Sequence, residues 1–81
     1  MPSVFESKGF NFSFFSSDIN EPIHIHVTKG DGFAKIWLEP EISWAFCYSF
    51  KPKEKRSIFK IVKNNKELLI EKWYEYFDKY K

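Results

Sequence analysis

Two histidines, His24 and His26, are the residues of this sequence with the most obvious chemical potential. Alternate residues of a β-strand point to the same face of a sheet, so a strand through this segment places both imidazoles side by side. Such a pair can share a cation, or one ring can act as a general acid or base. The pair can equally be half-buried sheet residues whose nitrogens bond to Glu21, Glu39 or a neighbouring strand.

The sequence supplies few further ligands for a metal ion. A zinc site requires three or four protein ligands, whereas the chain has two histidines, one cysteine (Cys47) and no His-Glu-x-x-His motif. We therefore expect no metal site and no other cofactor. Cys47 alternates with Ala45 and Ser49, which indicates a small core residue and not a nucleophile. A single cysteine also excludes an internal disulfide and is typical of a reducing compartment.

The elements around the histidines predict which side chains join them. Residues 23–28 and 33–39 each alternate between aliphatic and polar or aromatic residues, and a glycine-rich turn at 29–32 connects them. A symmetric antiparallel hairpin leaves one face wholly aliphatic and makes the opposite face dense in polar and aromatic groups, and we expect that opposite face to stay partly open. The expected cross-strand pairs are His24 with Trp37, His26 with Lys35 and Thr28 with Phe33. The polar face comprises His24, His26, Lys35, Trp37 and Glu39, and the last two are candidate binding residues.

This face has the groups that a metal-independent ribonuclease requires. A base removes the proton of the 2′-hydroxyl, an acid protonates the leaving oxygen and a cation stabilises the phosphorane. His24, His26 and Lys35 are the candidate catalytic residues, and Trp37 is placed to stack against a base. These residue types are common, so the sequence leaves open whether the chain is an enzyme. If it is one, a metal-independent ribonuclease is the leading hypothesis.

The remaining pattern predicts a single α+β domain over residues 1–81, because a chain of 81 residues allows one core. Residues 1–50 are strand-rich and residues 51–81 are helical. We expect an antiparallel sheet of about five strands, with the C-terminal helical segment packed on one face. The strands outside the hairpin are expected at 3–7, 10–14 and 42–49.

The last strand and the segment after it predict how the helix meets the sheet. In the strand, large residues alternate with small ones, and we expect the small face against the helix. From Pro52 the period becomes helical. One helix over 52–80 would be roughly 40 Å long and would overshoot strands of about 20 Å. We therefore expect two helices, or one bent helix, with a break near Asn64 and Asn65. The large residues of the strand are Ile42, Trp44, Phe46 and Tyr48.

Charge is unevenly distributed along the chain. Residues 1–50 carry three basic and six acidic residues, a net charge of −3, whereas residues 51–81 carry ten and five, a net charge of +5. A basic helix can attract a phosphate backbone or an acidic partner, or it can simply be a solvated helix face. The candidate binding residues on this segment are Lys53, Arg56, Lys60 and Lys63. No apolar run approaches the ~20 residues of a membrane span, so we expect a cytoplasmic protein with no membrane partner.

Several segments together resemble the bacterial family of unknown function numbered 4160. The most specific is Glu21-Pro22-Ile23-His24-Ile25-His26-Val27, and the tail Leu68-Leu69 through Trp73 to Tyr76-Phe77 supports it. The resemblance spans nearly the whole chain and implies no established activity. Genes of this family are often expected beside a second small gene of toxin-antitoxin type, which implies RNA or a cognate small protein as the partner.

Two functional expectations follow. The first is a small toxin-antitoxin-associated module that engages RNA or a cognate protein through the His24, His26, Lys35 and Trp37 face together with the basic helix. The second is a non-catalytic binding or regulatory module that forms a homodimer, or pairs with another protein, through an aromatic surface.

Overall fold

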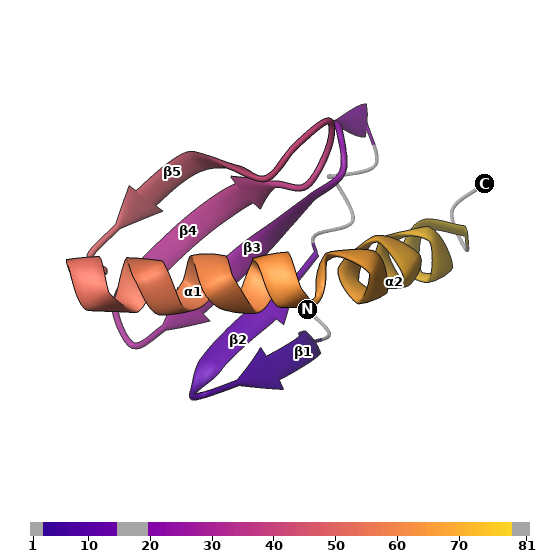
Figure 1. Ribbon diagram of the computed structural model, residues 1–81. Coiled ribbons are helices and arrows are strands. Elements are labelled where there is room, and N and C mark those ends of the chain that lie inside the picture. Colours follow the sequence, from indigo (N-terminus) through magenta and orange to yellow (C-terminus); the bar gives the residue numbers. More distant parts are fainter. Residues whose placement is uncertain (1–2, 15–19, 79–81) are drawn as a thin grey trace.

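The computed structural model describes residues 3–14 and 20–78, which form a five-stranded sheet followed by two helices (Figure 1). The strands follow one another across the sheet in chain order, and each neighbouring pair is antiparallel. This arrangement confirms the predicted α+β fold. The elements are β1 (Ser3–Ser7), β2 (Phe10–Ser13), β3 (His24–Lys29), β4 (Gly32–Trp37), β5 (Ser43–Tyr48), α1 (Pro52–Asn64) and α2 (Lys66–Asp78).

The central hairpin of β3 and β4 has the predicted register. His24 lies opposite Trp37, His26 opposite Lys35 and Thr28 opposite Phe33. A slip of one residue would turn every aliphatic side chain away from the core, so the period-two pattern specifies this register strongly. The aliphatic residues of the hairpin are fully buried; they are Ile25, Val27, Ala34, Ile36 and Leu38.

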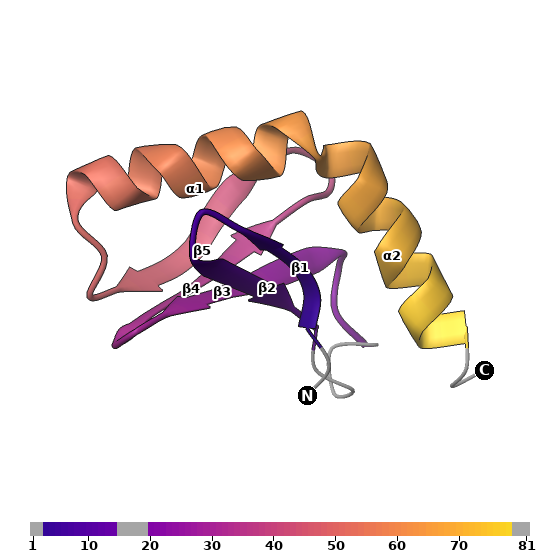
Figure 2. The same cartoon turned by 90° about the horizontal axis from the view of Figure 1, so that it is seen from below.

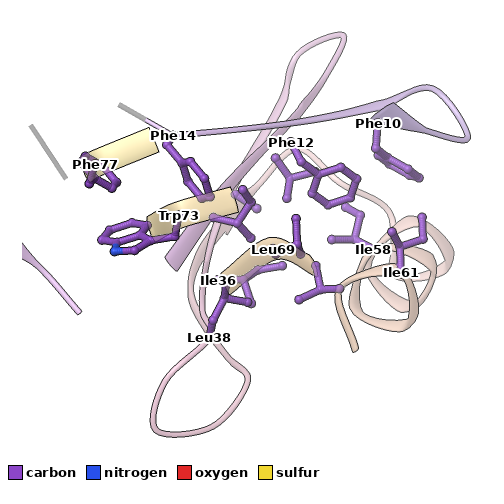
Figure 3. Close-up of a cluster of buried hydrophobic side chains, with 14 residues drawn as sticks. Phe10, Phe12, Phe14, Ile36, Leu38, Ile58, Ile61, Leu69, Trp73 and Phe77 are labelled. Carbon is purple, nitrogen blue, oxygen red and sulfur yellow. The ribbon is translucent and has the colours of Figure 1, made fainter. Parts of the chain in front are cut away.

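Helix α1 lies across the aliphatic face of the sheet (Figure 2). Its buried side chains, Ile58, Ile61 and Val62, belong to the same hydrophobic cluster as the sheet residues. Phe10 and Phe12 extend this core over β2 (Figure 3). The core therefore sits between one face of the sheet and the helices, and it is rich in aromatic side chains.

The helical segment breaks at Asn65, where the sequence predicts it. The Asn65 backbone has φ −119° and leaves the helical region. Its side-chain Nδ2 donates a hydrogen bond to the carbonyl oxygen of Ile61 at 2.8 Å, and the same oxygen also accepts a hydrogen bond from the Asn65 amide at 3.1 Å. The two bonds hold Asn65 at the C-terminal end of α1. The amide of Leu69 then bonds to the carbonyl of Asn65 at 2.9 Å, which starts the next helix. Within the described residues, neither helix is long and apolar enough to cross a membrane.

After this break α2 turns toward the end of the sheet (Figure 2). Leu69, Trp73 and Phe77 of α2 are buried in the core cluster. The ring centroid of Phe14, just after β2, lies 5.3 Å from that of Trp73 and 6.0 Å from that of Phe77. Aromatic packing therefore holds α2 against Phe14, just after the end of β2.

Strand β5 differs from its predicted pattern because it contains a bulge. Lys35 pairs with Phe46, but the next residue, Ile36, pairs with Trp44, so Ala45 is the extra residue on β5. Trp44 consequently shares the face of Ile36, which α1 covers, while Phe46 shares the face of Lys35. The prediction that all large residues of this strand lie on one face is therefore wrong.

Candidate functional site

His24 and His26 lie side by side, as predicted, but both are buried. Their ring centroids are 5.0 Å apart, and the two residues are 0% and 6% exposed. The rings of His24 and Trp73 meet edge to face with centroids 5.3 Å apart, because α2 turns toward this end of the sheet. The expectation that the face stays open is wrong at the histidines. Helical periodicity locates a break but does not give the direction that the next helix takes.

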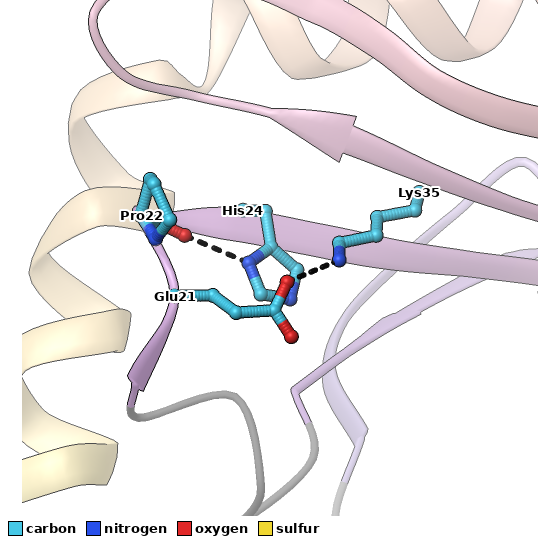
Figure 4. A network of polar contacts seen from close by, with 4 residues as sticks. All are labelled: Glu21, Pro22, His24 and Lys35. Carbon is cyan, nitrogen blue, oxygen red and sulfur yellow. Dashed lines mark hydrogen bonds and ion pairs between the residues drawn. The ribbon is translucent and has the colours of Figure 1, made fainter.

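Both imidazoles contact aromatic rings, and that of His24 also contacts the backbone. Nδ1 of His24 donates a hydrogen bond to the carbonyl oxygen of Pro22 at 2.8 Å (Figure 4), and its ring meets that of Trp37 at 5.3 Å. The ring of His26 stacks on that of Phe33, with centroids 5.8 Å apart and an interplanar angle of 3°. These contacts orient the rings inside the fold and do not present them to a dissolved substrate. The geometry therefore favours the structural interpretation of the pair.

The ammonium group of Lys35 contacts both a carboxylate and an aromatic ring. It forms an ion pair with the carboxylate of Glu21 (Figure 4) and lies 4.5 Å from the centroid of the Trp37 ring. The side chain of Lys35 is only 13% exposed. A paired, mostly buried ammonium is poorly placed to stabilise a phosphorane, so the candidate catalytic set does not form an accessible site.

Trp37 and Glu39 line a hollow of about 310 Å³ at the end of β4. The carboxylate residue Glu41 lines it as well, so acidic residues outnumber basic ones in its wall. A phosphate backbone is repelled from such a surface. This hollow therefore does not favour RNA as a ligand, although the sequence predicts Trp37 and Glu39 as binding residues.

The basic residues predicted on the helix are all exposed on α1. Between α1 and β5 lies an open groove of about 780 Å³, to which Trp44 of β5 and Phe59 of α1 contribute aromatic rings 6.2 Å apart. The Lys55 ammonium lies 5.7 Å from the centroid of the Trp44 ring. The basic residues that line the groove are Lys55, Arg56, Lys60 and Lys63, whereas Lys53 lies outside it.

The histidine cluster and the groove lie on opposite faces of the sheet. His26 and Lys35 are cross-strand partners on one face. Trp44 shares the other face with its partner Ile36, against which α1 packs. The histidine face and the groove on the basic helix therefore do not form one continuous surface.

The sequence analysis missed Trp44, Phe59 and Lys55 as groove residues. Lys55, Phe59 and Lys63 recur at four-residue spacing, which places them on one side of a helix and is a signal that could have been used. Trp44 could not have been found in this way, because the bulge at Ala45 reverses the face on which it lies.

The sequence was also compared with known proteins. The sequence model of one family, described as domain of unknown function (DUF4160), matches residues 9–74. The chain belongs to this family. The match confirms the suspected family, and it includes the histidine segment and the C-terminal tail as far as Trp73 but not Tyr76-Phe77. No curated protein and no solved structure matches the chain.

In residues 3–14 and 20–78, no group of three or more His, Cys, Asp and Glu side chains is arranged to hold a metal ion. The His24 and His26 pair thus has no third ligand among the described residues.

Cys47 is expected to be a slow nucleophile in this member of the family. Burial raises the pKa of its thiol, and the nearby Lys55 ammonium lowers it only in part. A raised pKa leaves less thiolate at neutral pH, and thiolate is the reactive form. We expect alkylation of the folded protein by iodoacetamide at neutral pH to be several-fold slower than alkylation of the same chain in denaturant. Equal rates in the two states would contradict this prediction.

Proposed function

We propose that this protein is a small binding module that holds a single strand of RNA, without cleaving it, in the groove between α1 and β5. One observation carries the proposal: two aromatic rings, Trp44 and Phe59, line a groove together with four basic side chains. Proteins that bind single strands combine a positively charged groove with aromatic rings on which bases stack. The basic C-terminal part of the chain supplies the charge.

Each component has a definite role in such binding. Stacking of a base on an aromatic side chain contributes about 1–3 kcal/mol and needs no particular base. Basic side chains that neutralise phosphates release counterions, so affinity falls with salt. A duplex offers no free base faces to Trp44 and Phe59, so the groove should prefer a single strand.

The expected result is salt-dependent binding of a labelled RNA strand of about 12 nucleotides, measured by fluorescence anisotropy. Four phosphate contacts predict an affinity loss of roughly 50-fold between 50 and 200 mM salt. The double change Arg56→Gln/Lys60→Gln should weaken binding at least tenfold. The control Lys8→Gln/Lys72→Gln removes the same charge outside the groove lining and should have little effect.

Phe59→Leu tests the stacking component, because it removes the ring and keeps an apolar side chain. We expect weaker binding with an unchanged salt dependence. A DNA strand of the same sequence tests whether the groove prefers ribose, and an RNA duplex tests whether it prefers a single strand. The RNA should remain intact with or without EDTA, because no cleavage is expected. Equal loss of affinity in the groove variant and its charge control would refute the groove as the binding site.

A second candidate function, pairing with a cognate protein as in a toxin-antitoxin module, is favoured by a different observation. Tyr48 is 62% exposed, and its ring belongs to a chain of contacts with Phe46 and Phe33 on the face opposite α1. Exposed aromatic residues are typical of protein interfaces. Such pairing should respond weakly to salt, which distinguishes it from RNA binding in the same titration.

A further inference from the structure

Strand β5 forms one edge of the sheet, and its sequence does little to protect that edge (Figure 1). Edge strands present unpaired N–H and C=O groups, and proteins commonly protect them with charged residues or proline. Residues Ser43–Tyr48 include neither. The opposite edge strand, β1, carries the exposed Glu6. Only the bulge at Ala45 interrupts the regularity of β5.

The charges at the two ends of β5 are opposite in sign. Glu39 and Glu41 precede the strand, whereas Lys51 and Lys53 follow it. The acidic Glu54 next to them is paired with Lys29 at 4.0 Å. When two copies of a strand pair antiparallel about a two-fold axis, the start of one lies beside the end of the other. Acidic and basic ends would then meet twice in one interface, which favours a second copy over an arbitrary partner.

We propose that the protein forms a homodimer by antiparallel pairing of β5 with β5 of a second copy. The pairing would satisfy the free backbone groups of both edges and continue the sheet from one copy to the next. It would also bring the exposed ring of Tyr48 beside aromatic residues of the second copy, and cross-strand aromatic pairs stabilise sheets.

The dimer places the two grooves on the same side of the joined sheet. A two-fold axis perpendicular to a sheet reverses strand direction and keeps each face on its own side. Both α1 helices therefore lie on one face, and the two Trp44 side chains line a single basic trough between them. This joining of the grooves rests on the proposed RNA binding, whereas the strand pairing does not.

Sedimentation equilibrium of the full chain tests the pairing. We expect a mass twice the 9.8 kDa of the chain. Ala45 is exposed on the edge strand, so Ala45→Lys and Ala45→Glu should both weaken dimerisation at least tenfold. A lysine and a glutamate at this position should both block the strand edge, whereas they would change the charge of the basic groove in opposite directions. Equal effects of the two variants on dimerisation therefore indicate edge blocking. Glu6→Lys on the β1 edge is the matched control and should remain dimeric.

A charge exchange tests the orientation of the two strands. Glu41→Lys should weaken the dimer several-fold at low salt, and adding Lys51→Glu should restore it, because the two exposed side chains are proposed to face each other across the interface. A wild-type chain that stays monomeric at high micromolar concentration would overturn the proposal. So would dimerisation that persists in both Ala45 variants, or β5 amides protected from exchange only when a different protein is added.

RNA binding by the dimer provides an independent readout. The monomeric Ala45→Glu variant should bind an RNA strand that fills one groove as tightly as the wild type does. It should bind a strand twice as long more weakly than the wild type, because only the dimer offers two joined grooves to one strand. A dimer that binds no RNA would refute the proposed function and leave the strand pairing intact. A monomer that binds both lengths as tightly as wild type would refute the joined trough.

Discussion

Replacement of Trp73 by alanine is expected to lower the free energy of unfolding by about 3–5 kcal/mol, the usual cost of truncating a buried aromatic residue. Trp73 joins α2 to the rest of the fold. Its ring centroid lies 4.3 Å from that of Phe77, 5.3 Å from that of Phe14 and 5.3 Å from that of His24. A domain of 81 residues has a total stability of roughly 4–12 kcal/mol. The change should therefore remove a large part of the stability of the domain.

Urea unfolding followed by circular dichroism measures this loss, and Tyr74→Ala is its control. Tyr74 is the next residue on α2 and is 58% exposed, so its truncation should change the stability by less than about 0.5 kcal/mol. Modification by diethyl pyrocarbonate gives a second readout, because Trp73 covers His24. We expect His24 to react slowly in the wild type and rapidly in Trp73→Ala. Similar stabilities of the two variants would contradict the packing of α2 described above.

Elements whose pattern is local were predictable from the sequence. The β3 and β4 register follows from strict alternation, since every aliphatic residue must reach one face. The helix break at Asn65 follows from the length of the helical segment and the short polar side chains there. Both features depend on residues close to one another in the chain, and the structure has both as predicted.

The features that the sequence did not predict depend on contacts between distant segments. Ala45 becomes a bulge only when β5 pairs with β4, and this pairing decides the face of Trp44. The burial of His24 depends on the direction of α2, which aromatic packing with Phe14 sets. Three of the four groove cations, Arg56, Lys60 and Lys63, were therefore predicted from the sequence, whereas the position of Trp44 and the closure of the histidine face depend on these distant contacts.

Gly32→Ala is the second change with a large expected effect. A Cβ at this position would lie 2.7 Å from Cδ1 and Cζ of the Phe50 ring, and closer still to Cε1. The Phe50 ring also packs against the ring of Phe10, with centroids 5.9 Å apart, which limits how far it can move. Overpacking of this kind costs about 1–3 kcal/mol. The glycine is thus required by close approach of a ring and not by an unusual backbone conformation.

A double-mutant cycle separates this cause from a general intolerance of the turn. Phe50→Ala removes the obstructing ring, so the cost of Gly32→Ala should fall by at least about 1 kcal/mol in that background. Gly30→Ala is the control, since its Cβ meets nothing within 4 Å and its cost arises from a φ of +58°. That cost should be the same with or without the Phe50 ring. If both glycine variants responded alike, the ring would not be what excludes a side chain at Gly32. If only Gly32 responds, Phe50 fixes the connection from β5 to α1 and so helps to hold the two walls of the groove in place.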